Sequence, residues 1–299
     1  MTVFPAAQFE RAEKRALART TQFDGGQVAY WYYPAKGKSK GDIVFVHGFR
    51  GAHDGLHAII AQLEDFDCYA PDIPGYGLTA PAKTEHNLAT YSRFLGSFLA
   101  GLKLKEKPTV VGHSFGSLIV ARHAFEAKGD VNRVVLINPV SKPGLEGPRR
   151  FISLCTSVVL KFARLLPEAG SRFIVDSWPV IRFVSATMFK GSDKAIRRWV
   201  HQQHHATMVR YANKNVLFES YQASIEESVE KYAPSIKNRT LLIWGEFDDI
   251  TSLEQQREVF PKWTNAEFDL IKGVGHLTHY EASEQVAAMI NKFLSAAKK

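Results

Sequence analysis

Short runs of β-branched and other apolar residues recur along this chain, and a helical pattern follows most of them. The clearest runs are DIVFV at 42–46, RVVLI at 133–137 and TLLIW at 240–244. A strand that is apolar at nearly every position fits one that is buried on both faces of a parallel sheet. Strands that alternate with helices require crossover connections, which predicts an α/β fold with a mostly parallel sheet and flanking helices.

The alternation stops in the middle of the chain. After Pro139 the patterns are helical for almost a third of the sequence, and strand-like runs resume only at Thr240. A helical segment between two halves of an α/β pattern is typical of an inserted cap. We therefore expect a core domain formed by residues 1–140 and 234–299, with a helical cap over residues 141–233.

The sequence GHSFG at 112–116 is the first candidate for a catalytic site. It has the form G-x-S-x-G, follows the apolar run at 109–111 and precedes a helix-forming run. A strand, a sharp turn and a helix are what a nucleophile elbow requires, because the strained turn holds the serine hydroxyl clear of the sheet. We predict that Ser114 is a nucleophile; the alternative is a glycine-rich turn in which this serine caps the helix.

A serine hydroxyl is a weak nucleophile until a base removes its proton, and eleven histidines are candidates for that base. His276 lies beyond the last predicted strand and before the last predicted helix. Loops at the carboxyl ends of parallel strands are where such sheets place their sites, so His276 is the predicted base. His47 and His113 flank a glycine or the nucleophile in tight turns, and we expect them to line the pocket.

The group that orients the histidine should come from another loop at the same edge of the sheet. The loop after the run at 240–244 reads GEFDDI and offers the adjacent aspartates Asp248 and Asp249. The loop after Ile137 has no carboxylate. The candidate acid therefore lies in the GEFDDI loop, unless both aspartates only cap the helix expected near Ser252.

Two hydrogen-bond donors should face the oxyanion of a tetrahedral intermediate. We expect one to be the backbone N–H of Phe115, which follows the nucleophile. The other is the N–H of Phe49 in the sequence HGFRG at 47–51, because this loop leaves the first buried strand. Gly48 permits the sharp turn beside the pocket, and we expect Arg50 to hold the loop. A plain glycine-bearing strand exit is the alternative.

Together these motifs closely resemble those of the α/β-hydrolase superfamily, specifically its capped esterase- and lipase-like members. The motifs are VHGF at 46–49, DIPGYG at 72–77, GHSFG, GEFDD and GHLTHYE at 275–281. The order of Ser114, Asp248 and His276 along the chain separates this fold from other folds that carry a catalytic triad. The G-x-x-D spacing of the class favours Asp248 over Asp249.

The resemblance implies a serine hydrolase that cleaves a carboxylic ester bond through an acyl-enzyme and needs no cofactor. A thioesterase, a lactonase, a carbon–carbon bond hydrolase and a non-catalytic ligand-binding protein of the same fold remain alternatives. Dehalogenases and epoxide hydrolases of this fold carry aspartate where Ser114 stands. The carbon–carbon bond hydrolases usually show Asn and Met where this chain has His113 and Phe115. In the family, DIPGYG shapes a turn, so Asp72 is not a catalytic candidate.

The expected cap is rich in large apolar residues. They are Phe151, Leu154, Leu160, Phe162, Leu165, Phe173, Trp178, Ile181, Phe183, Met188 and Phe189. At helical spacing we expect most of them to pack on the core domain. Others should roof Ser114, which favours a small substrate with a lipophilic moiety. His201, His204 and His205 have the spacing of a helical metal site, but no carboxylate completes it, and no metal is expected.

The net charge of +8 is spread over scattered pairs without a basic arm or a nucleic-acid module, so no nucleic-acid partner is expected. Charges interrupt every apolar run before it could span a bilayer, which argues against integral membrane association. The N-terminal stretch lacks an apolar signal core, and Cys68 and Cys155 form no disulfide framework. We expect a cytoplasmic protein; the sequence does not indicate its oligomeric state.

Overall fold

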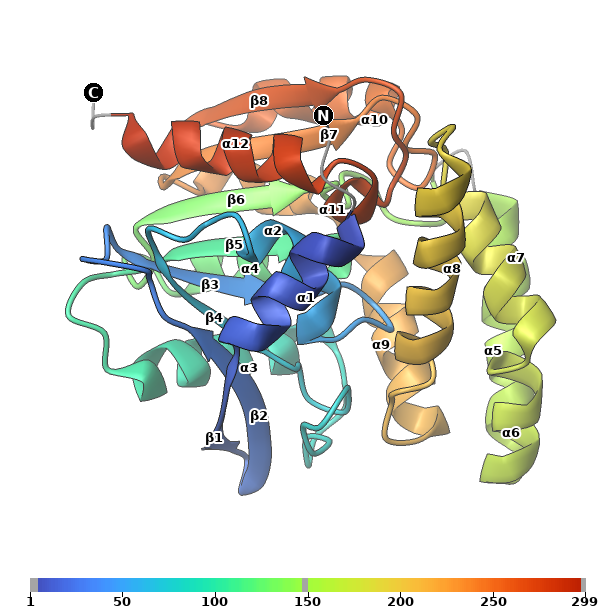
Figure 1. Cartoon of the computed structure of the whole chain (residues 1–299). Coiled ribbons are helices and arrows are strands. Elements are labelled where there is room, and N and C mark those ends of the chain that lie inside the picture. The colour runs from blue at the N-terminus through green and yellow to red at the C-terminus, as the bar shows by residue number, and fades with distance from the viewer. Residues whose placement is uncertain (1–4, 147–149, 297–299) are drawn as a thin grey trace.

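The computed structural model describes residues 5–146 and 150–296 of the chain (Figure 1). The outermost residues of the expected core domain, 1–4 and 297–299, lie outside the described residues. So do residues 147–149 of the expected cap.

Within the described residues, one sheet of eight strands forms the centre of the protein, in the order β1-β2-β4-β3-β5-β6-β7-β8. Strand β2 is antiparallel to both of its neighbours, and the strands from β4 to β8 are parallel. This confirms the predicted α/β fold with a mostly parallel sheet. The strands are β1 (Leu17–Phe23), β2 (Gly26–Tyr33), β3 (Asp42–Val46), β4 (Asp67–Pro71), β5 (Thr109–His113), β6 (Arg133–Ile137), β7 (Arg239–Gly245) and β8 (Ala266–Ile271).

The first hairpin turns at Asp24 and Gly25, both with positive φ. Its first strand, β1, begins at Leu17 and pairs with β2 along its whole length. Most side chains of β1 are exposed. A strand at the edge of a sheet with two solvated faces carries no apolar alternation that would mark the residue at which it begins.

Helices cover both faces of the sheet because alternate residues of each central strand point to opposite sides. In β3, Val44 and Val46 pack with α3 (Leu88–Leu102) and α4 (Phe115–Glu126), whereas Ile43 and Phe45 pack with α2 (His57–Ile60) and α12 (Ser283–Ser295). The helices of the core are α1 (Pro5–Arg15), η1 (His53–Leu56), α2 (His57–Ile60), α3 (Leu88–Leu102), α4 (Phe115–Glu126), α10 (Leu253–Val259), η4 (Phe260–Lys262), α11 (Thr278–Glu281) and α12 (Ser283–Ser295).

Two glycines let β5 and α4 pass close to the neighbouring backbone on either side of Ser114. A Cβ atom at Gly112 would clash with the carbonyl group of Gly116, and one at Gly116 would clash with the carbonyl oxygen of Val46. The G-x-S-x-G pattern is therefore a packing requirement. Only residues without a side chain fit where the strand, the turn and the helix meet.

A group of helices lies between β6 and β7 in the chain, where the sequence predicts a helical insertion. In Figure 1 the arrowhead of β6 points toward this group. The helices are α5 (Arg150–Leu165), α6 (Glu168–Val175), α7 (Trp178–Met188), α8 (Lys194–Thr207) and α9 (Lys214–Glu226), followed by η2 (Val229–Lys231) and η3 (Ala233–Ser235). Over residues 5–146 and 150–296, no helix has both the length and the apolar content needed to cross a membrane.

The prediction that most large apolar residues of residues 151–189 pack on the core domain is wrong. Leu160, Ile181 and Phe189 are buried, and Met188 is partly buried. The other seven are exposed: Phe151, Leu154, Phe162, Leu165, Phe173, Trp178 and Phe183. The physical reason is that these helices bury mostly small residues and few large ones. The buried side chains are Ser157, Leu160 and Ala163 in α5, Ser171 and Val175 in α6, and Ile181 and Ser185 in α7.

Candidate active site

Three loops at the carboxyl ends of parallel strands bring Ser114, His276 and Asp248 together. The hydroxyl oxygen of Ser114 lies 2.7 Å from Nε2 of His276. On the other side of the ring, Nδ1 of His276 lies 2.8 Å from Oδ2 of Asp248. When Nδ1 carries the proton that the carboxylate accepts, Nε2 has a free lone pair directed at the hydroxyl. The arrangement can therefore take a proton from Ser114.

The backbone of Ser114 adopts a conformation that non-glycine residues rarely adopt, with φ of 52° and ψ of −119°. Such a conformation costs on the order of 1–3 kcal/mol and persists only where the surroundings hold it. Here the N–H of Ser114 donates to the carbonyl oxygen of Ile137 at 3.0 Å, and its own carbonyl accepts from the N–H of Ser117 at 2.8 Å. The turn is thus anchored to β6 and to the first turn of α4.

Asp248 is buried and its carboxylate is surrounded by donors. Besides His276, Oδ2 accepts from the amide of Asn138 at 2.8 Å and from the hydroxyl of Thr251 at 3.0 Å. Oδ1 accepts from the backbone N–H groups of Ile250 and Thr251 at 3.0 and 3.1 Å. Burial raises the pKa of this carboxyl, but the interactions with His276 and these hydrogen bonds outweigh it and lower the pKa. The group is therefore a fixed negative charge.

The neighbouring aspartate points elsewhere. Oδ2 of Asp249 forms an ion pair with Nζ of Lys190 at 2.8 Å, and about a third of its side chain is exposed (36%). The structure therefore brings Asp248, and not Asp249, to the imidazole of His276.

Asn138 is a site residue that the sequence argument missed. It follows β6 with a positive φ of 47°. Its amide donates to Asp248, and its carbonyl oxygen accepts from the hydroxyl of Thr278. The loop after Ile137 has no carboxylate, so a search for the acid partner of His276 does not select it. Its position at the carboxyl end of a strand between those of Ser114 and Asp248 was the signal that could have found it.

The two residues that are expected to donate to an oxyanion both lie close to Ser114. Phe115 is the first residue of α4, so its N–H has no acceptor within the helix. A Cβ atom added at Gly48 would lie 3.2 Å from Cβ of Ser114, which places the 47–51 loop against Ser114. The ring of Phe49 packs near those of Tyr76 and Tyr221. The arrangement is compatible with backbone donation from Phe49 and Phe115.

Buried side chains fix this loop from both ends. Nδ1 of His47 donates to the carbonyl of Gly48 at 2.9 Å, and Nε2 accepts from the N–H of Ile73 at 3.0 Å. Arg50 donates to the carbonyl of Met208 at 2.8 Å and pairs with Asp176 at 2.9 Å. Arg50 therefore ties the loop to the inserted helices.

A small cavity of about 60 Å³ lies in front of Ser114. His47, Gly48, Phe49 and His113 line it on the side of the strands. The inserted helices contribute the other side, with Met188 from the end of α7, His204 and Thr207 from α8, and Met208.

Neutral histidines surround this cavity. Burial, followed by the charge of His276, lowers the pKa of His113 to about 3. Nε2 of His113 lies 3.2 Å from the carbonyl oxygen of His276 and can donate to it. Burial also lowers the pKa of His204 to about 3 and that of His279 well below its usual range. These rings therefore line the site and carry no charge at neutral pH.

The three histidines of α8 do not converge on one point. Nδ1 of His201 and Nδ1 of His204 lie 2.6 and 2.8 Å from the hydroxyl of Ser185. The side chain of His205 is exposed and lines a groove on the surface. No group of three or more His, Cys, Asp or Glu residues in the described part of the chain could hold a metal ion.

Known proteins resemble this chain in sequence and in fold. The model of a family described as "Alpha/beta hydrolase family" matches residues 43–289. Putative esterase/lipase 3 of Mycoplasma genitalium is 30% identical over 40% of this chain, which spans only 44% of that protein. Mouse monoacylglycerol lipase ABHD6 is 21% identical over 95% of this chain and 84% of its own. The enol-lactonase from Burkholderia xenovorans superposes with a TM-score of 0.77 at 17% identity, covering 93% of this chain and all of that one.

The buried histidines predict how stability depends on pH. The pKa of His204 falls from 6.5 to about 3 on folding, so between these values the unfolded chain binds the extra proton. The contribution of His204 to the free energy of unfolding is therefore complete above pH 6.5 and is lost as pH falls toward 3. The loss amounts to about 1.4 kcal/mol per pH unit for each such histidine. His57 and His113 act in the same direction.

Urea unfolding at about pH 7 and about pH 5 measures this effect. We expect a lower free energy of unfolding at about pH 5 than at about pH 7. In His204→Asn this difference should be smaller by the amount that one buried histidine contributes. His205→Asn on the same helix is the matched control and should leave the pH dependence of the wild type. Equal pH dependence in all three proteins would contradict the assignment.

Proposed function

The chain belongs to the alpha/beta hydrolase family, and from this membership we propose that it is a serine hydrolase that cleaves the carboxylic ester of a small lipophilic substrate. One observation carries the proposal. The hydroxyl of Ser114 lies 2.7 Å from an imidazole nitrogen whose partner nitrogen lies 2.8 Å from a buried carboxylate. This is the arrangement that activates a serine for acyl transfer.

In the acylation step Oγ of Ser114 attacks the carbonyl carbon of the ester while Nε2 of His276 takes its proton. The electron pair of the carbonyl moves to oxygen, and the N–H groups of Phe49 and Phe115 donate to the resulting oxyanion. Collapse of this intermediate breaks the bond to the alcohol, which leaves with the proton from His276. In deacylation His276 takes a proton from water, which attacks the acyl-enzyme. Collapse of the second intermediate returns this proton to Oγ of Ser114 and releases the carboxylic acid product.

Asp248 acts through His276. Its fixed charge keeps the proton on Nδ1 and stabilises the imidazolium that forms when Ser114 is deprotonated. The amide of Asn138 and the backbone N–H groups after Asp248 keep the carboxylate in one orientation. His113 adds a neutral donor to the carbonyl of His276.

The proposed preference for lipophilic substrates depends on the inserted helices. We propose that residues 141–233, which contain these helices, form a cap over Ser114. Met188, Met208, Leu56 and Leu277 are among the apolar side chains that line the cavity before Ser114. A volume of about 60 Å³ is far below the several hundred Å³ of an ordinary ligand pocket. We therefore expect the end of α7 and α8 to move when a substrate enters, and the substrate will then contact these apolar side chains beside the neutral histidines.

The two adjacent aspartates provide a test of the acid. Asp248→Asn should lower kcat on an activated ester by about 10³- to 10⁴-fold, because an amide no longer stabilises the imidazolium. Asp249→Asn removes the same charge one residue away and should change kcat by less than about tenfold. Steady-state kinetics measures both variants. A larger loss in Asp249→Asn than in Asp248→Asn would contradict the assignment.

A substrate series tests the proposed reaction. Purified protein should hydrolyse p-nitrophenyl esters with kcat/KM rising from acetate to medium-chain acyl groups, because the acyl chain is buried among apolar side chains. Ser114→Ala should reduce every rate to near that of the uncatalysed reaction. Equal turnover of charged polar esters would overturn the lipophilic preference. Turnover confined to thioesters or lactones would replace the ester assignment.

A further inference from the structure

Helix α5 turns its apolar side away from the protein. Phe151, Leu154, Val158, Phe162 and Leu165 recur at helical spacing, and each is more than half exposed. A surface helix of a globular protein usually buries such a stripe in the core and exposes its polar side. The stripe on α5 is therefore left open to solvent by the residues that the structure describes.

The apolar surface continues over the next two helices. Phe173 of α6 is 83% exposed, and Trp178 and Phe183 of α7 are each 61% exposed. Helix α6 contacts both α5 and α7, and the three helices form the outermost layer at the right of Figure 1. We call this surface the outer face; it comprises Phe151, Leu154, Val158, Phe162, Leu165, Phe173, Trp178 and Phe183. Exposed apolar surface of this extent marks an interaction site.

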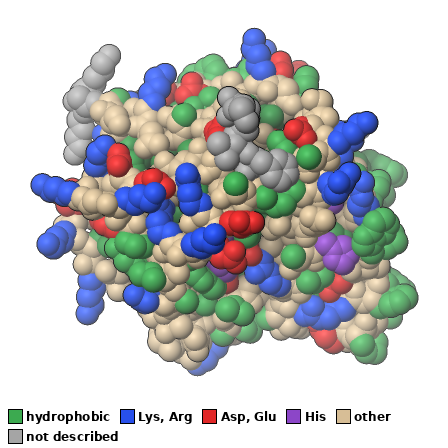
Figure 2. All heavy atoms as spheres, viewed as in Figure 1, with side chains coloured by type: hydrophobic (Ala, Val, Ile, Leu, Met, Phe, Trp, Pro, Cys, Tyr) green, Lys and Arg blue, Asp and Glu red, His purple; other side chains and the backbone are tan. Residues whose placement is uncertain are grey.

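Positive charge surrounds the outer face. The chain from 150 to 207 contains nine lysines and arginines but three acidic residues, so it carries most of the net charge of +8. The helices α5, α7 and α8 contain no acid. Of the three acids, Asp176 pairs with Arg50 and Asp193 caps α8. Figure 2 shows hydrophobic side chains along the right-hand edge, with Lys, Arg and His side chains beside them.

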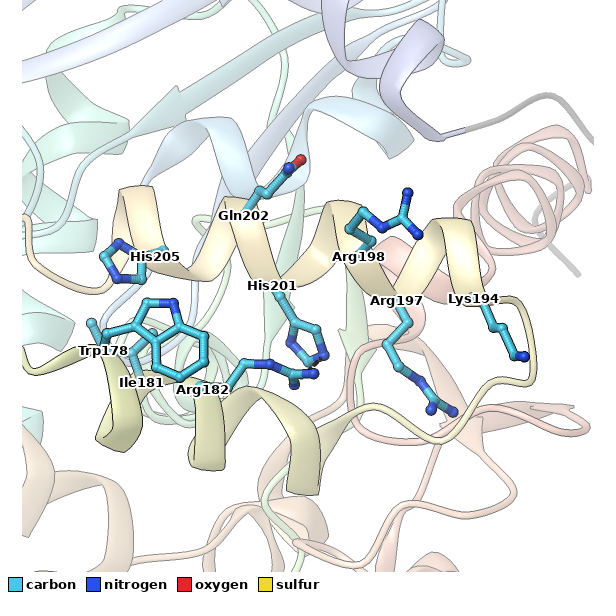
Figure 3. Close-up of a pocket in the computed structure, with 9 residues that line it drawn as sticks. All are labelled: Trp178, Ile181, Arg182, Lys194, Arg197, Arg198, His201, Gln202 and His205. Carbon is cyan, nitrogen blue, oxygen red and sulfur yellow. Dashed lines mark hydrogen bonds between the residues drawn. The ribbon is translucent and has the colours of Figure 1, made fainter.

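A basic groove of about 540 Å³ lies beside the outer face, between α7 and α8. Figure 3 shows Trp178 and Arg182 on α7 facing His201 and His205 on α8. The rest of the lining includes Lys194, Arg197 and Arg198 and contains no acid. None of Lys194, Arg197 and Arg198 forms an ion pair within the part of the chain that the structure describes. The groove can therefore receive anionic groups.

We propose that the outer face docks on the surface of a bilayer that contains anionic phospholipids. Helices with an apolar side and a basic polar side lie in the plane of the interface, with the apolar side chains among the acyl chains. Trp178 lies where the apolar surface meets the groove, as tryptophan does at membrane interfaces. Lysines and arginines around the face attract the headgroups, and the groove receives their phosphate groups. This inference goes beyond the proposed reaction and does not require it.

The distribution of charge favours a membrane over a second copy of this chain. A symmetric dimer through the outer face would place two copies of the same basic surface against each other. Arg164 of α5 pairs with Glu219 of α9 at 3.8 Å, but α5 and α7 contain no acid that could face Lys161 or the other cations of the second copy. A surface of phosphate groups supplies the opposite charge across the whole face.

Sedimentation with vesicles tests the proposal, and the Ser114→Ala variant serves as the parent so that catalysis plays no part. It should bind vesicles of phosphatidylcholine with about one-third phosphatidylglycerol at least tenfold more tightly than vesicles of phosphatidylcholine alone. Adding Phe162→Ser and Leu165→Ser together should weaken binding to the mixed vesicles by tenfold or more. Adding Lys194→Gln and Arg198→Gln together should abolish most of the preference for phosphatidylglycerol.

Matched controls lie at the opposite side of the molecule. Leu17→Ser removes an exposed leucine of β1, and Lys38→Gln with Lys105→Gln removes two exposed lysines; neither should change vesicle binding. Unchanged urea midpoints will show that every variant is folded. Failure to bind mixed vesicles, or equal binding by the outer-face variants and the controls, would overturn the proposal. A dimer of the parent protein would also overturn it, if light scattering shows that Phe162→Ser with Leu165→Ser converts this dimer to a monomer.

Discussion

The hydrogen bond between the buried carboxylate of Asp248 and the imidazole of His276 is the interaction on which the site depends. A buried charge is tolerated only where donors surround it, and the donors here come from separate loops. Strands β5, β6, β7 and β8 are neighbours in the sheet, and their exits supply Ser114, Asn138, Asp248 and His276 in turn. The sheet order therefore decides that these four side chains meet, and the carboxylate decides how the imidazole is held.

The central part of the fold could be predicted because it follows from local chemistry. Strands buried on both faces have continuous apolar sequences, and the glycines around Ser114 are required by backbone contacts on both sides of the turn. The placement of Ser114 and His276 at one edge follows from the rule for parallel sheets. The choice between Asp248 and Asp249 came from spacing, since two adjacent aspartates have the same local chemistry.

Other features depend on contacts that a sequence does not display. Asn138 reads as an ordinary turn residue, and its role comes from the carboxylate that it contacts across the sheet. The edge strand from Leu17 has no apolar alternation. Periodicity in α5 correctly indicates a helix with an apolar side, but it does not say whether protein, lipid or water covers that side. Small residues such as Ser157 and Ala163 face the core instead, which is why the expected packing was wrong.

The central claim is that the arrangement around Ser114 makes its hydroxyl reactive. A fluorophosphonate probe measures this most directly, because serine displaces its fluoride to form a phosphonate ester only where a base removes the proton and donors stabilise the anionic oxygen. Mass spectrometry of the labelled protein should find one adduct, on the peptide that contains Ser114, and none in Ser114→Ala. An unlabelled wild-type protein, or equal labelling of Ser114→Ala, would contradict the account.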